Sequence, residues 1–185
     1  GCRTGVMDPI RLTELIAPAY YSLHRAVKNG RYDEYFLKGG RGSAKSSFVS
    51  LEIVLGMMRE PGANAIVFRK VAATLRESVY EQMIWAIERL GLGDELKYRL
   101  SPLEIENTRT GQRILFRGAD DPGKSKSIKL ARGYFGFLWF EELAEFRGME
   151  DVRTIKAGVV RGLPEGRRCV TFCSYNPPAS QRSWV

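Results

Sequence analysis

A glycine-rich octapeptide between an apolar run and a helical run constrains this chain more than any other segment. Residues 39–46 read GGRGSAKS, directly after the strand-like run 35–37 and directly before the helix expected over 46–58. Glycines let successive backbone N–H groups turn inward, and the helix that follows adds the positive end of its dipole. A strand, such a loop and a helix, in this order, are the context of a phosphate-binding loop.

The loop contains the side chains that a nucleoside triphosphate requires. Lys45 is placed to bridge the β- and γ-phosphates, and the Ser46 hydroxyl is placed to bind Mg²⁺. The usual GxxxxGK[ST] pattern has glycine where this chain has Ala44, and we expect a near-helical backbone to tolerate the methyl group there. A glycine-rich turn without a ligand is the alternative, which the flanking elements disfavour. The expected ATP-binding residues are Gly39, Gly40, Arg41, Gly42, Ser43, Ala44, Lys45 and Ser46.

The rest of the chain alternates short apolar runs with amphipathic stretches, which predicts a mainly parallel α/β sheet with helices on both faces. Further strands are expected over residues 65–68, 135–140 and 169–174. Residues 74–77, TLRE, form a predicted capping box that opens a helix ending near Leu90. The runs at 103–106 and 113–116 flank the turn TRTG, and they predict a hairpin or two edge strands.

Composition bounds the class of protein. The chain has 185 residues, 44% of them hydrophobic, which suits one core, so we expect a single domain over residues 7–185 and a non-native leader or expression scar over 1–6. No apolar run reaches the roughly 18 residues of a membrane span. Three cysteines without CxxC spacing encode neither a disulfide framework nor a zinc site. A net charge of +8 favours a polyanionic partner, nucleic acid first.

Three polar side chains follow the ends of two later strands. Glu141 and Glu142 follow the apolar run 137–140, and Asn176 follows the strand expected at 169–174. The carboxyl ends of parallel strands share one crevice, so these groups are predicted to face the phosphate loop, with Glu141 near the metal and Glu142 as the base. The alternatives are acids that complement a helix dipole and an Asx turn at Asn176.

The ordered set GGRGSAKS, FLWFEE at 137–142 and SYNPP at 174–178 resembles the N-terminal ATPase domain of the large terminase subunit of tailed bacteriophages and prophages, of the PBSX-like type. FRK at 68–70, LRESVYEQ at 75–82 and RGADDPGKSKSI at 117–128 extend the resemblance. It implies a P-loop ATPase fold of the ASCE type, with an extra strand between the phosphate-loop strand and the acidic-motif strand. It also implies a motor that uses Mg²⁺ and ATP to drive double-stranded DNA through the portal protein into a procapsid.

The resemblance implies roles for single residues as well. Glu141 would support the metal, Glu142 would activate water, and Asn176 would sense the γ-phosphate and relay hydrolysis to DNA movement. Arg41 matches an arginine that acts on the γ-phosphate in cis, and Arg132 is our candidate for an arginine that completes a neighbour's site. The implied assembly is a homo-oligomeric ring in the bacterial host cytoplasm, which a small terminase subunit recruits to DNA.

Two other functions compete with this interpretation. One is a helicase-type or translocase ATPase of the same superfamily, and the other is an assembly module that binds ATP without hydrolysis. The nuclease domain that such terminases carry is not expected within residues 1–185. Arg69 and Lys70, after the second strand, are weak candidates for DNA contact. The solitary His24 is expected to be structural and to lack a carboxylate partner.

Overall fold

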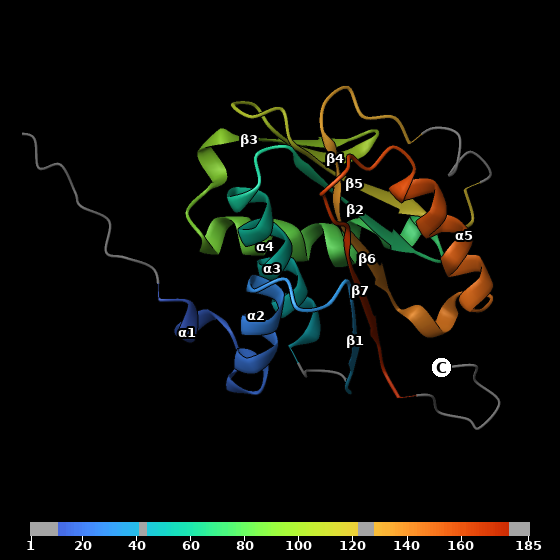
Figure 1. Cartoon of the computed structure of the whole chain (residues 1–185), viewed down its shortest axis with the longest axis horizontal. Helices are drawn as coiled ribbons and strands as arrows, with labels where there is room; N and C mark the ends of the chain where they lie inside the picture. The colour runs from blue at the N-terminus through green and yellow to red at the C-terminus, as the bar shows by residue number, and fades with distance from the viewer. Residues whose placement is uncertain (1–10, 41–43, 122–127, 178–185) are drawn as a thin grey trace, which may run out of the picture.

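The computed structural model describes residues 11–40, 44–121 and 128–177. Within these residues a seven-stranded sheet forms the centre of the molecule, in the order β1-β7-β6-β2-β5-β4-β3 (Figure 1). The strands are β1 (Glu34–Lys38), β2 (Ala63–Arg69), β3 (Leu96–Leu100), β4 (Leu103–Asn107), β5 (Arg113–Gly118), β6 (Tyr134–Glu141) and β7 (Val170–Tyr175). Strands β1, β7, β6, β2 and β5 run parallel to one another. The sheet continues with β4, which is antiparallel to β5, and with β3, which is antiparallel to β4.

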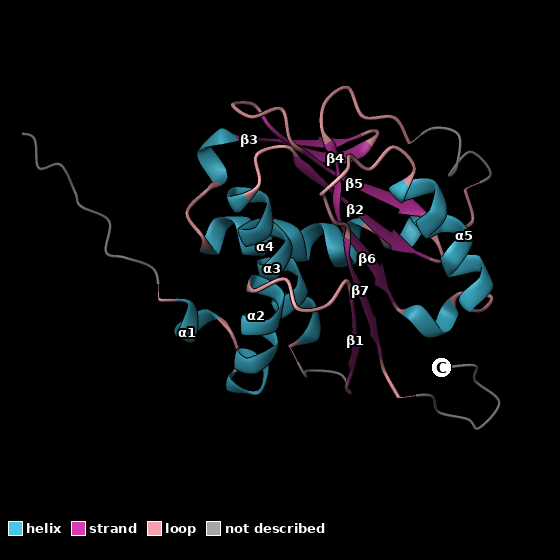
Figure 2. Cartoon of the chain, in the orientation of Figure 1, coloured by secondary structure: helices cyan, strands magenta, loops and turns pink. Residues whose placement is uncertain are grey.

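Helices cover both faces of the sheet, as predicted (Figure 2). The α-helices are α1 (Leu12–Leu15), α2 (Tyr21–Lys28), α3 (Lys45–Arg59), α4 (Glu81–Arg89) and α5 (Met149–Val160). Figure 1 shows α2, α3 and α4 on one face and α5 on the other. None of the helices in the described part of the chain is long and apolar enough to cross a membrane.

The strand order is the one that the resemblance implies. β7 lies between β1, which leads into the phosphate loop, and β6, which ends in the acidic pair. Because these strands are parallel, their carboxyl ends meet at one edge of the sheet. The tip of β2 reaches the same edge, since Phe68 pairs with Phe140 across the two strands. Four segments that are distant in sequence therefore surround one crevice.

The central strands are continuous apolar segments, which is why the sequence predicts them. β2 and β6 are buried along almost their whole length, because helices pack on both faces of the sheet. Trp139 is fully buried in β6 and its indole N–H donates to the Ser174 hydroxyl of β7 over 2.8 Å. This bond satisfies the one polar atom of the largest core side chain.

Two local expectations were wrong. The predicted capping box does not form: the Thr74 hydroxyl donates to the carbonyl of Val71 over 2.6 Å, and a π-helical turn over Arg76–Tyr80 precedes α4. The hydroxyl is therefore used inside a preceding 3₁₀ turn, Ala72–Thr74. The predicted pairing of 103–106 with 113–116 is confirmed, but β5 is an interior strand because its other side pairs with β2.

Candidate functional site

The phosphate loop is tied to the end of β7. The backbone N–H of Gly39 donates to the carbonyl of Tyr175 over 3.2 Å. Lys45 is the first residue of α3. Its ammonium group donates to the carbonyls of Gly39 and Gly40, and to Oδ1 of Asn176 over 3.0 Å. Lys45 thus lies where loop and strand tip meet. Of the predicted loop residues, Arg41, Gly42 and Ser43 lie outside the described part of the chain.

The residue before the lysine corrects one expectation. Ala44 has φ 63° and ψ 18°, which is the left-handed region and not the near-helical conformation expected from the sequence. A Cβ atom is disfavoured there, and glycine is the residue that adopts this conformation without cost. The backbone therefore follows the path for which the usual pattern places glycine, and alanine occupies it with strain.

Several of the predicted site residues line one cavity of about 310 Å³. Lys45 and Ser46 line it from α3, Glu141 and Glu142 from the end of β6, and Asn176 from the end of β7. The sequence prediction that strand ends bring these groups together is confirmed in this respect. Partial burial lowers the pKa of the Lys45 ammonium, while the carboxylates of Glu142 and Glu141 act in the opposite direction.

The acidic pair is held by an arginine from the neighbouring strand. The Nε of Arg69 donates to Oε2 of Glu141, and its Nη2 lies 3.7 Å from Oε1 of Glu142. Burial raises the pKa of the Glu141 carboxyl, and the guanidinium of Arg69 is the largest opposing influence. Glu142 itself has a left-handed backbone with φ 57°, which turns the chain sharply at the end of β6. The geometry thus places Arg69 on the carboxylates.

Sequence reasoning missed Gln82 as a residue of this cavity. It lies on α4 and lines the cavity, and its Nε2 donates to the Ser47 hydroxyl over 3.4 Å. It also lines an adjoining cavity of about 500 Å³ that shares Ser46 and Glu141. The run LRESVYEQ is the signal that could have indicated it. A π-helical turn directly before α4 sets the direction of that helix, and such turns are frequent at functional sites.

Arg132 lies far from this cavity. It precedes β6, whereas Glu141 ends the same strand, and the eight residues of β6 span roughly 23 Å. Arg132 instead lines a polar cavity with Arg99, Arg109 and Arg113. It therefore cannot act on a nucleotide bound to its own phosphate loop.

His24 was expected to have no carboxylate partner, and this expectation was wrong. Its Nδ1 contacts Oε1 of Glu52, which is fully buried on α3. Burial raises the pKa of the Glu52 carboxyl, and Oε2 of this residue has no hydrogen-bond partner in the described structure. The two residues are 28 positions apart, so only the packing of α2 on α3 brings them together.

The strand order and the shared cavity define the class of protein: a P-loop NTPase of the ASCE type. The chain belongs to the phage terminase large subunit family, whose model matches residues 32–185. It is 43% identical over 180 residues to the large terminase subunit of Bacillus phage SPP1, a match that covers 97% of this chain and 42% of that protein. It is 38% identical over 121 residues to the PBSX phage terminase large subunit of Bacillus subtilis strain 168, which covers 65% of this chain and 27% of that protein. The chain thus spans less than half the length of these relatives.

Solved structures show the same fold at low sequence identity. The large terminase of bacteriophage HK97 superposes with a TM-score of 0.62 at 14% identity, over 95% of this chain and 35% of that one. The large terminase ATPase domain of Thermus phage P74-26 superposes with a TM-score of 0.61 at 14% identity, over 88% of this chain and 70% of that one. These likenesses show that the described residues share the fold of those structures.

Proposed function

We propose that this chain is the ATPase motor domain of a DNA-packaging terminase, which couples hydrolysis of Mg²⁺-bound ATP to movement of double-stranded DNA into a procapsid. One observation carries the proposal: a single cavity collects Lys45, Ser46, Glu141, Glu142 and Asn176 from three separate elements. A site that only binds nucleotide needs the loop, whereas hydrolysis also needs carboxylates beside it.

The phosphate loop would bind the triphosphate. In this structure the Lys45 ammonium donates to two loop carbonyls and to Asn176. In the nucleotide complex the β- and γ-phosphates would replace these acceptors. Release from Lys45 frees the Asn176 amide, which is then positioned to contact the γ-phosphate from the tip of β7. Arg41, in the loop, would act on the γ-phosphate in cis, because a guanidinium matches the geometry of phosphate oxygens.

The donor set suits magnesium. The Ser46 hydroxyl and the Glu141 carboxylate line the same cavity, and hard oxygen ligands are those that Mg²⁺ prefers. When bound with ATP, the ion would neutralise the charge that develops on the phosphates. Arg69 forms an ion pair with Glu141 in this structure, so part of this ion pair must break when Glu141 binds a metal ion.

Glu142 would orient and deprotonate the attacking water. Its side chain is about one third exposed to the cavity, and its contact with Arg69 is long at 3.7 Å. A carboxylate with such a loose partner is free to accept a proton. Arg69 binds Glu141 more closely than Glu142. This difference suits a metal ligand at Glu141 and a base at Glu142.

Arg132 would complete the site of a neighbouring subunit. It lies at the opposite end of β6 from its own acidic pair, so it can reach a nucleotide only in another subunit, and a head-to-tail ring would provide this contact. Such a ring at the portal protein, supplied with DNA through the small terminase subunit in the host cytoplasm, is the proposed assembly. The net charge of +8 suits contact with DNA.

The test is ATP hydrolysis over a range of protein concentrations, with and without double-stranded DNA and Mg²⁺. We expect turnover that requires Mg²⁺, rises faster than linearly with protein and disappears in Glu142→Gln, which still binds ATP. Lys45→Ala should lose productive ATP binding, and Arg132→Ala should lose the dependence on concentration. Equal turnover in Glu142→Gln and the parent would overturn the assignment of the base. Tight ATP binding without turnover at any concentration would favour an assembly module.

A further inference from the structure

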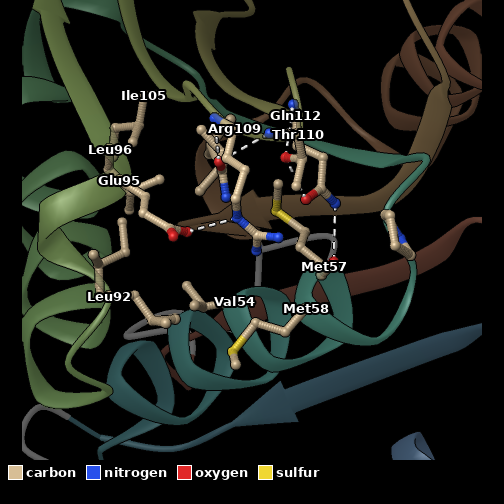
Figure 3. A pocket seen from close by; sticks show the side chains of 14 residues that line it. Val54, Met57, Met58, Leu92, Glu95, Leu96, Ile105, Arg109, Thr110 and Gln112 are labelled. Atoms are coloured by element: carbon tan, nitrogen blue, oxygen red, sulfur yellow. Dashed lines mark hydrogen bonds and ion pairs between the residues drawn. The ribbon is translucent and has the colours of Figure 1, made fainter.

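A separate cavity, of about 320 Å³, lies at the far end of α3 from the phosphate loop (Figure 3). Val54, Met57 and Met58 line it from the last turns of α3, and Ile105 and Ile114 line it from β4 and β5. Met57 is twelve residues after Lys45, which corresponds to roughly 18 Å along the helix. The cavity is therefore separate from the proposed nucleotide site.

The walls of this cavity are mostly apolar and preformed. Gln112, which is 6% exposed, donates from Nε2 to the carbonyls of Met57, Glu60 and Ala63 at 2.7–3.0 Å and accepts from the Thr110 hydroxyl. These bonds fix the β4–β5 turn against the end of α3. The N–H donors of the Gln112 amide are therefore already used by the protein.

One cationic group at the rim is only partly used. Arg109 reaches across the mouth of the cavity, and its Nε donates to Oε2 of Glu95 over 3.1 Å (Figure 3). Its two terminal nitrogens have no partner among the described residues. The turn that carries Arg109 is held by Oδ1 of Asn107, which accepts from the backbone N–H groups of Arg109 and Thr110 at 2.9 and 3.1 Å. The guanidinium therefore presents free donors from a rigid base.

We propose that this cavity binds a small organic acid, with an aromatic or branched aliphatic body inside and one carboxylate or sulfonate at Arg109. Apolar walls with few convergent polar groups, in a volume above 300 Å³, are typical of small-molecule sites. The donors left at the rim select an acceptor, and a guanidinium pairs with a planar anion through two parallel bonds. Met57 and Met58 are flexible side chains that adapt to the shape of an apolar ligand.

The test uses a matched pair of fluorescent probes on the purified chain. Anilinonaphthalene sulfonate has the aromatic body and the anion, and N-phenyl-naphthylamine has the same body without the anion. We expect both probes to bind, and Arg109→Gln to weaken the sulfonate about tenfold while leaving the uncharged probe unchanged. Lys97→Gln, which removes an exposed cation on β3 outside the lining, is the control and should change neither affinity.

Filling the cavity supplies the second arm. Val54→Phe should abolish binding of both probes, and Met58→Trp, at a position that is 55% exposed, does the same at the rim if the first variant fails to fold. Unchanged sulfonate affinity in Arg109→Gln, or in a folded cavity-filling variant, would overturn the proposal. Displacement of the probe by ADP would also overturn it, because the probe would then occupy the phosphate-loop site. Absence of ATP turnover in the parent chain, with probe binding as expected, would count against the proposed function alone.

Discussion

Nζ of Lys45 donates to Oδ1 of Asn176 across 3.0 Å, a contact between residues 131 positions apart. The contact predicts an asymmetry between two substitutions at Asn176. Asn176→Asp places a carboxylate on the lysine and beside the expected γ-phosphate, so ATP should bind at least tenfold more weakly. Asn176→Ala lacks this repulsion and should lose much less affinity. Titration with ATP and with ADP checks the prediction, and equal ATP affinity in Asn176→Asp and the parent would contradict it.

Removing Arg69 should strengthen the binding of Mg²⁺-nucleotide. The guanidinium holds Glu141 and repels a cation at the same carboxylate, so Arg69→Gln removes a competitor for the oxygen. We expect Mg²⁺-ADP to bind several-fold more tightly and ADP without Mg²⁺ to bind unchanged. Arg153→Gln, an exposed arginine on α5, is the control. Weaker Mg²⁺-ADP binding in Arg69→Gln would show that Arg69 positions Glu141 for the metal instead of competing with it.

Ala44→Gly should stabilise the protein. The left-handed backbone raises the free energy of the folded protein when the residue is alanine. Glycine avoids this strain, and its greater freedom in the unfolded chain offsets only part of the gain. The free energy of unfolding should rise by up to about 1 kcal/mol. Ala157→Gly, at an exposed helical position on α5, should instead lower it by about 1 kcal/mol. Urea unfolding measures both, and a loss of stability in Ala44→Gly would refute the claim that Ala44 is strained.

The buried Glu52 should make stability fall as pH rises. Its pKa in the folded state is raised above the ordinary 4.5 by burial, against the effects of His24 and Arg59. The folded protein therefore binds this proton more tightly than the unfolded chain does, and the free energy of unfolding decreases as pH rises above about 4.5. Glu52→Gln should flatten this dependence and be the more stable protein at neutral pH. Melting temperatures between pH 4 and 8 check it, with the exposed Glu165→Gln as control.

The parts of the fold that sequence could predict are those whose signal is local. β2 and β6 read as continuous apolar runs because both of their faces are covered, and the glycine-rich loop has its own local signature. β3 was not predicted, because this edge strand, LKYRL, is half exposed and carries two cations. Its weak pattern does not differ from that of a loop.

The site follows the same division. The groups at strand ends could be predicted to converge, since parallel strands share one edge. The contact of Arg69 with Glu141 joins residues 72 positions apart on neighbouring strands, so it depends on the pairing of β2 with β6. The left-handed backbone at Ala44 was missed because alanine rarely adopts it, although the usual pattern has glycine at this position.

β6 gives the subunit two unlike ends, since the acidic pair lies at one end and Arg132 precedes the other. With Arg132 in its proposed role, a two-fold dimer that joins like ends would leave both sites incomplete. In the proposed ring each subunit places its Arg132 end against the acidic end of the next subunit. Such a ring closes only when the rotation from one subunit to the next is a whole fraction of 360°. The directions of the surfaces at the two ends of β6 would therefore set the rotation between neighbouring subunits, and with it the number of subunits around the DNA.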